Sequence, residues 1–139
     1  MQQLLQHAFP SDTAQLEQVR RRIRDTLRAL ECSSDFIESC VLAVDEAASN
    51  VMRHGYGVGN EGQLLLTIAV DGSDVVFLLR DYADPFDAEA QEIPANGELR
   101  VGGYGRLLIS EIMDSVRYCE VTAGNLLEMR RRLELTAQA

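Results

Sequence analysis

The stretch Val44-Asp45-Glu46-Ala47-Ala48-Ser49-Asn50-Val51-Met52-Arg53-His54-Gly55-Tyr56 decides how the rest of the chain is interpreted. It ends a segment in which apolar residues recur at helical spacing from Ile37 onward. At about 100° per residue, Glu46 falls opposite the apolar side, and Asn50 and His54 follow it at intervals of four. The segment therefore predicts one helix, from near Ser34 as its cap to about His54, with a line of polar side chains.

This polar line has a chemical interpretation and a structural alternative. Ala43 and Ala47 lie beside it, and their small side chains are expected to leave room for a bulky ligand. The amide oxygen of Asn50 suits Mg²⁺, a hard cation that keeps most of its waters and bridges phosphates. Glu46, one turn away, is placed to accept a proton from a water or hydroxyl that attacks a terminal phosphate. The alternative is an ordinary solvated helix face.

The segments on either side predict an α+β two-layer sandwich of helices on an antiparallel sheet. Loops as long as the polar stretch 81–100 are usually functional in compact domains. The arginines of the first helix indicate a solvated face or, alternatively, a docking surface for a partner. The expected elements are a short strand over 4–9, helices over 16–30 and from the glycines at 102–105 to about 114, and hairpins over 64–80 and 116–135.

Two further features point to a ligand. Asp81 follows an apolar strand, where a buried carboxylate needs a donor such as the exocyclic amine of a base. An ordinary turn aspartate is the alternative. The run Gly102-Gly103-Tyr104-Gly105 precedes an apolar helix, so its backbone N–H groups and the helix dipole favour an anion there. A simple helix cap is the alternative.

Composition narrows the function classes. The chain has 139 residues, 46% of them hydrophobic, which predicts one globular domain over 1–139. Its net charge of −9 argues against direct binding of nucleic acid, and it offers neither a membrane span nor a secretory signal. The three cysteines suggest no disulfide framework and no zinc site, so we expect a cytoplasmic protein. All thirteen basic residues are arginine, which excludes the lysine-dependent phosphate loop of common NTPases.

The order of these motifs resembles a known superfamily. A Glu-x-x-x-Asn helix, an aspartate at a strand end, a loop and a Gly-x-Gly that opens a helix are found together in the ATP-binding domain of sensor histidine kinases and gyrase-type topoisomerases. Within that superfamily the chain is most similar to the anti-sigma factor serine/threonine kinases. The similarity rests on the stretch 44–56, on 81–87, on the glycines through Met113-Asp114, and on the hairpin from Gly124 to Met129.

The resemblance implies a Bergerat-type fold with a mixed, mostly antiparallel sheet that carries its helices on one face. It also implies ATP and Mg²⁺ as cofactors, with Glu46 as catalytic base and Asn50 as the metal ligand. Ala83 departs from the family, which usually has glycine there, and could crowd the adenine or only lower affinity. Arg100 is a further possible contact to the phosphates. The ATP-binding residues implied are Asn50, Asp81, Ala83, Pro85, Gly102, Gly103, Tyr104, Gly105, Arg106 and Leu107.

Three functions follow from the resemblance. The first is an ATP-dependent serine/threonine protein kinase that phosphorylates an anti-anti-sigma protein of the STAS type, sequesters a sigma factor and forms a homodimer. The second is a non-catalytic module that binds nucleotide and regulates a partner by stoichiometric contact. The third, a fragment of a sensor histidine kinase, is disfavoured because only one helix precedes Glu46 and the only histidine before it is His7.

Overall fold

The computed structural model describes residues 1–57, 59, 61–84 and 101–136, with the backbone alone at 101–104. Their elements follow the expected order, so the predicted succession of helices and strands is confirmed. Each predicted boundary lies within a few residues of the observed one, apart from the end of the second helix. The elements are β1 (Gln2–Pro10), η1 (Thr13–Gln15), α1 (Leu16–Ala29), α2 (Ser34–Asn50), η2 (Val51–Gly57), β2 (Gln63–Asp71), β3 (Asp74–Asp81), α3 (Val101–Ile112), β4 (Ser115–Cys119) and β5 (Asn125–Arg132).

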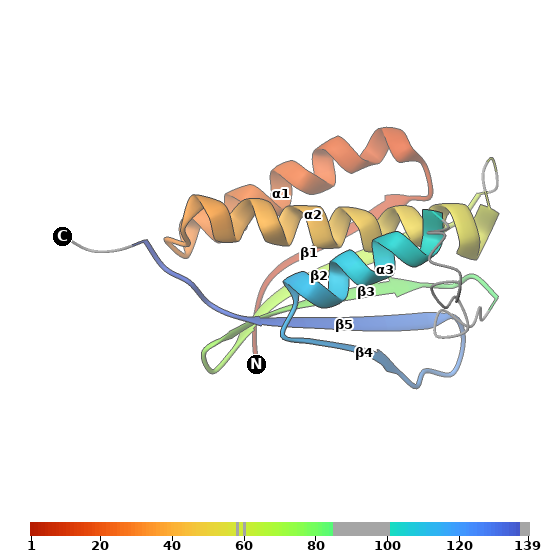
Figure 1. The fold of residues 1–139 in the computed structure, drawn as a ribbon. Helices are drawn as coiled ribbons and strands as arrows, with labels where there is room; N and C mark the ends of the chain where they lie inside the picture. The colour runs from red at the N-terminus through yellow and green to blue at the C-terminus, as the bar shows by residue number, and fades with distance from the viewer. Residues whose placement is uncertain (58, 60, 85–100, 137–139) are drawn as a thin grey trace, which may run out of the picture.

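The strands form one sheet in the order β1-β2-β3-β5-β4, and the three α-helices cover one face of it (Figure 1). The predicted α+β sandwich is therefore confirmed. The sheet was expected to be mixed, but all four pairings among the described strands are antiparallel. β3 is the central strand, and it ends, at Asp81, on the side of the molecule where α2 ends and α3 begins (Figure 1).

α1 is an amphipathic helix whose apolar stripe faces the core. Leu16, Val19, Ile23 and Leu27 are its buried residues, at the spacing that the sequence indicates. The arginine face is only partly a solvated one, because two of its side chains bind α2. Arg20 lies 2.7 Å from Asp45, and Arg24 lies 2.9 Å from Glu38.

α2 lies between α1 and α3 above the sheet (Figure 1). The predicted core face, which includes Cys40, Val44 and Ala48, is buried as expected. Ala43 and Ala47 are buried too, at 0% and 3% exposure. The expectation that these two alanines leave space for a ligand is therefore wrong, because both belong to the buried core.

The two ends of α2 differ from the sequence prediction. Ser33, not Ser34, caps the helix, because its Oγ accepts from the Phe36 amide. At the other end the α-helix stops at Asn50 and the chain continues as the π-helical turn η2. Such widened turns occur frequently at functional sites.

The turn between α1 and α2 contains the one positive-φ residue other than glycine in the described chain, Glu31 at 62°. Its carbonyl accepts hydrogen bonds from the amide and the hydroxyl of Thr136.

None of the described helices is long and apolar enough to cross a lipid bilayer.

Candidate nucleotide site

Three polar side chains gather where α2 gives way to η2. Glu46 and Asn50 are one helical turn apart, and Arg53 follows on the same line. A guanidinium nitrogen of Arg53 donates to Asn50 Oδ1 at 2.9 Å and lies 3.7 Å from Glu46 Oε2. The side chains of Glu46 and Arg53 are both half-buried, so this charge pair is less screened than one in open solvent.

Gly105 of α3 lies directly against this group. A Cβ built on Gly105 would overlap Glu46 Oε2 and come within 3.6 Å of Asn50 Nδ2. Only a glycine therefore lets the first turns of α3 come this close to the α2 carboxylate. The predicted partnership between the Glu-x-x-x-Asn helix and the glycine run is thus present at Gly105.

Glu46 Oε2 is a buried atom with no hydrogen-bond partner among the residues that the structure describes. The Nε atom of Arg53 is in the same condition. A buried polar atom without a partner costs about 1–3 kcal/mol, so such atoms need an explanation. An acceptor on Glu46 and a donor on Arg53, side by side, suit a ligand that brings a hydroxyl proton and a negatively charged group.

Asp81, at the end of β3, is a fully buried acid with 2% exposure. Its Oδ1 accepts from the Ala83 amide at 3.0 Å and from Asn125 Nδ2 at 2.9 Å. Burial raises the pKa of Asp81 above its ordinary value, and these hydrogen bonds lower it only in part. A carboxylate in this environment gains from one more hydrogen-bond donor.

The backbone around Asp81 is fixed from two sides. The hydroxyl of Tyr56, in η2, accepts from the Tyr82 amide at 2.8 Å and donates to the Gln63 carbonyl at 2.7 Å. Gly124, at φ 73°, packs on the Asp81 carbonyl so closely that a Cβ would overlap it. Ala83 is buried at 5% exposure within this arrangement, and its methyl group fits without displacing Asp81.

The remaining predicted site residues lie on α3, in η2 or outside the described residues. Gly102, Gly103 and Tyr104 belong to the first turn of α3, so the helix begins at Val101 and includes the glycines. Arg106 is half-buried, and Leu107 is 39% exposed. His54 is exposed. Pro85 and Arg100 lie outside the described residues.

Arg53 is the residue that the sequence interpretation missed. A signal for it was present, because positions 46, 50 and 53 are spaced by four and three and therefore lie on one helix face. The line was continued to His54 instead, on the assumption of an unbroken α-helix. Arg53 is a cation in direct contact with both Glu46 and Asn50.

The site fits a metal that arrives with its nucleotide. No group of three or more His, Cys, Asp or Glu side chains in the described part of the chain could hold a metal by itself. Asn50 offers one hard oxygen ligand, next to the unpartnered Oε2 of Glu46. That donor set suits Mg²⁺, which takes one or two protein ligands and completes its shell with water and substrate phosphates.

Comparison with known proteins agrees with this geometry. The Histidine kinase-like ATPase domain family matches residues 9–131. Serine-protein kinase RsbW from Staphylococcus epidermidis is 27% identical over 124 residues, which cover 83% of this chain and 78% of the relative. The protein of the same name from Oceanobacillus iheyensis is 31% identical over 93 residues, which cover 61% of this chain and 59% of that relative.

Solved structures support the same fold. The RsbU and RsbW domains of a Mycobacterium tuberculosis protein align with a TM-score of 0.66 at 15% identity, over 96% of this chain and 35% of that longer chain. A histidine kinase domain from Erythrobacter litoralis aligns with a TM-score of 0.55 at 12% identity, over 85% of this chain and 61% of its own. The resemblance found in the sequence is confirmed: the chain belongs to the histidine kinase-like ATPase domain family.

Proposed function

We propose that the protein is an ATP-dependent serine/threonine protein kinase that acts as an anti-sigma regulatory factor. It phosphorylates an anti-anti-sigma partner of the STAS type and sequesters a sigma factor, as the sequence resemblance implies. The observation that carries the catalytic part is Glu46 Oε2, which is buried against Gly105, lies 3.7 Å from Arg53 and accepts no hydrogen bond from any described residue. The serine-protein kinase relatives support the same reaction class.

Each residue of the site has a role in this reaction. Asp81 accepts a hydrogen bond from the adenine amine and so selects the base. Asn50 would hold Mg²⁺, which supplies charge neutralisation of the phosphates when bound. Arg53 leaves Asn50 to bind a phosphate oxygen, and it brings a positive charge that is already half-buried. Glu46 Oε2 takes the proton of the attacking serine or threonine hydroxyl.

The binding half of this proposal is tested by heat denaturation with Mg-ATP. A ligand that binds the folded state alone raises the melting temperature. We expect protection of the wild-type protein, less protection of Asn50→Ala with Mg-ATP, and little difference between these two proteins when the metal is chelated. Asp84→Asn, an exposed carboxylate near the site, is the control and should be protected like wild type. No protection at millimolar Mg-ATP would falsify the site.

The catalytic half is tested with Glu46→Gln. We expect this variant to keep Mg-ATP protection and to lose transfer of the γ-phosphate to an anti-anti-sigma protein. Ala83, at the position where the family usually has glycine, supports a second candidate, a non-catalytic nucleotide-binding regulator. In that case the wild-type protein would bind its partner and transfer no phosphate. The homodimer stays a prediction, which sedimentation equilibrium would measure.

A further inference from the structure

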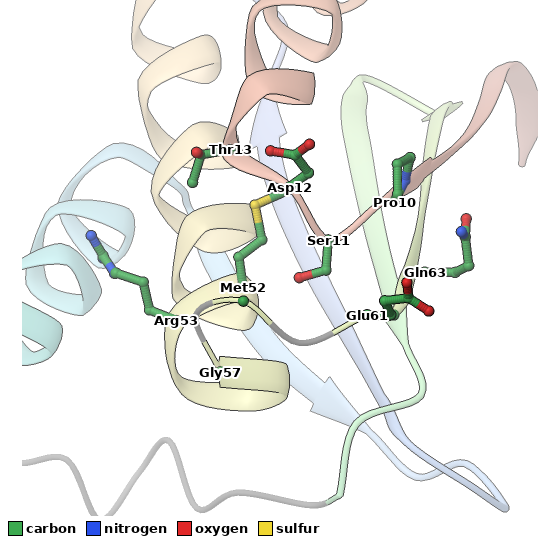
Figure 2. Close-up of a pocket in the computed structure, with 11 residues that line it drawn as sticks. Pro10, Ser11, Asp12, Thr13, Met52, Arg53, Gly57, Glu61 and Gln63 are labelled. Carbon is green, nitrogen blue, oxygen red and sulfur yellow. The ribbon is translucent and has the colours of Figure 1, made fainter.

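A cavity of about 620 Å³ lies between the turn that follows β1 and the π-helical turn η2 (Figure 2). Its volume is within the range of small-ligand and peptide side-chain pockets. Its lining includes Ser11, Asp12, Thr13, Met52, Arg53 and Glu61. None of the roles assigned above to Asp81, Asn50 or Glu46 uses this cavity.

The cavity wall contains a hydroxyl without a hydrogen bond. Ser11 Oγ is buried and has no partner among the described residues. Its backbone is held in place, because the Ser11 amide donates to the Gly62 carbonyl at 2.8 Å. A fixed, buried hydroxyl without a hydrogen bond is stabilised by a ligand that supplies one. A polypeptide backbone, which offers a donor and an acceptor at almost every residue, can form that hydrogen bond.

Arg53 belongs both to the wall of this cavity and to the group around Glu46. Its side chain lines the cavity, and its guanidinium points away from Ser11 toward Asn50 and Glu46 (Figure 2). Through Arg53 the cavity therefore borders the carboxylate that takes the proton in the proposed reaction.

The rim of the cavity is acidic. Asp12 and Glu61 are both exposed, and the nearest cation of the lining, Arg53, is engaged with Asn50 and Glu46. The whole chain carries a net charge of −9, so it adds no positive background. A ligand segment with a lysine or arginine beside its hydroxyl complements this rim.

We propose that this cavity receives the acceptor segment of the phosphorylation reaction: an extended stretch of partner polypeptide with a serine or threonine hydroxyl and a neighbouring basic side chain. The inference rests on the proposed kinase function. In the transfer, the hydroxyl oxygen bonds to the γ-phosphorus as the bond from that phosphorus to its bridging oxygen breaks. The hydroxyl proton passes to Glu46, and ADP leaves.

The test uses two short serine peptides that differ only in whether arginine or glutamate flanks the serine. Transfer of phosphate from Mg-ATP is measured for the full chain. We expect kcat/KM to favour the arginine peptide by about threefold or more, the factor of one partly exposed charge pair. Glu61→Arg should reverse this preference. Glu111→Arg, the same change at an exposed position on α3, should leave it unchanged.

Ser11→Ala provides a second, independent readout. The hydroxyl has no hydrogen-bond partner in the part of the chain that the structure describes, so its removal should leave folding stability and Mg-ATP protection unaltered. We expect KM for the arginine peptide to rise by about fivefold with kcat little changed, as for one lost hydrogen bond.

The outcomes separate this inference from the proposed function. A preference that Glu61→Arg does not move, or a Ser11→Ala variant with unchanged KM, overturns the cavity as the acceptor site. Phosphorylation of an anti-anti-sigma protein without phosphorylation of either peptide overturns it as well, and leaves the kinase function in place. Absence of Mg-ATP protection, or of phosphate transfer to the peptides and to that protein alike, is instead a failure of the proposed function.

Discussion

Asp81 combines a cost to stability with the proposed role in binding adenine. Its pKa is raised by burial, so its ionised form destabilises the fold at neutral pH, and protonation recovers stability as the pH falls through the raised value. Asp81→Asn keeps an oxygen that can accept from Ala83 and Asn125 and removes the buried charge. We expect a melting temperature at or above that of wild type, and Mg-ATP affinity lower by about tenfold.

Calorimetric unfolding and titration with Mg-ATP measure both effects. Asp84→Asn makes the same chemical change at an exposed site and should alter neither quantity. Strong destabilisation by Asp81→Asn, with affinity retained, would mean that the carboxylate serves the fold and not the nucleotide.

Gly105 tests the close approach of α3 to Glu46. Alanine is the better helix former by about 1 kcal/mol, so Gly105→Ala would stabilise a helix with open space beside it. Here the new methyl group overlaps the end of a flexible carboxylate, which can move aside. We expect a melting temperature within a few degrees of wild type and a large loss of phosphoryl transfer, because Glu46 is displaced.

An active and clearly stabilised Gly105→Ala protein would refute this contact. Ser110→Ala, at an exposed position of the same helix, is the matched control and should remain active.

The individual site residues were predictable to the extent that spacing defines them. Glu46, Asn50 and Gly105 meet as the motif order implies, because the family pattern specifies which helices come together. Helical periodicity alone misjudged Ala47, because it describes one helix against one surface and α2 is covered by α1, α3 and the sheet. The bond from Arg53 to Asn50 depends on side-chain orientation, which a one-dimensional pattern does not contain.

Among the elements, the connection from α1 to α2 is strained at Glu31. A residue with a Cβ pays about 1 kcal/mol or more for a left-handed backbone, which glycine adopts freely. Glu31→Gly keeps the carbonyl that accepts from Thr136, so we expect stabilisation by roughly 0.5–1 kcal/mol in urea unfolding. Glu31→Ala retains the strain and should show no gain. If Glu31→Gly and Glu31→Ala were equally stable, the gain could not come from relief of backbone strain at this position.

The helices and strands were largely evident from hydrophobic periodicity, since β2, β3 and α1 alternate or repeat regularly. The change from α2 to η2 was not evident. A π-helical turn shifts the hydrogen bonds by one residue without any residue type that marks it, so the sequence predicts a continued α-helix as far as about His54.

At the scale of the whole molecule, stability should depend on pH through His7. Burial, and second the positive charge of Arg22 on α1, lower the pKa of His7 below its ordinary 6.5. Between the two pKa values, His7 therefore binds a proton in the unfolded chain and stays neutral in the folded protein. Stability is fully present above about pH 6.5 and is lost as the pH falls below that value toward the lowered pKa.

His7→Gln removes this dependence. Urea unfolding of both proteins at about pH 8 and about pH 5 should show that the wild type loses more stability than the variant on acidification. All other titrating groups are shared, so the difference isolates His7. An identical loss in the two proteins would show that this histidine is not desolvated in solution.

The burial of α2 between two helices and a sheet also affects its thiol. Cys40 has 0% exposure, and burial raises its pKa to about 12. The reactive thiolate of Cys40 forms only when α2 separates from its neighbours. Cys119, by contrast, is partly exposed in the folded protein. Alkylation of Cys40, followed by mass spectrometry, therefore measures how often the core opens. Because Glu46 and Asn50 belong to the same helix, saturating Mg-ATP should slow that reaction while Cys119 continues to react.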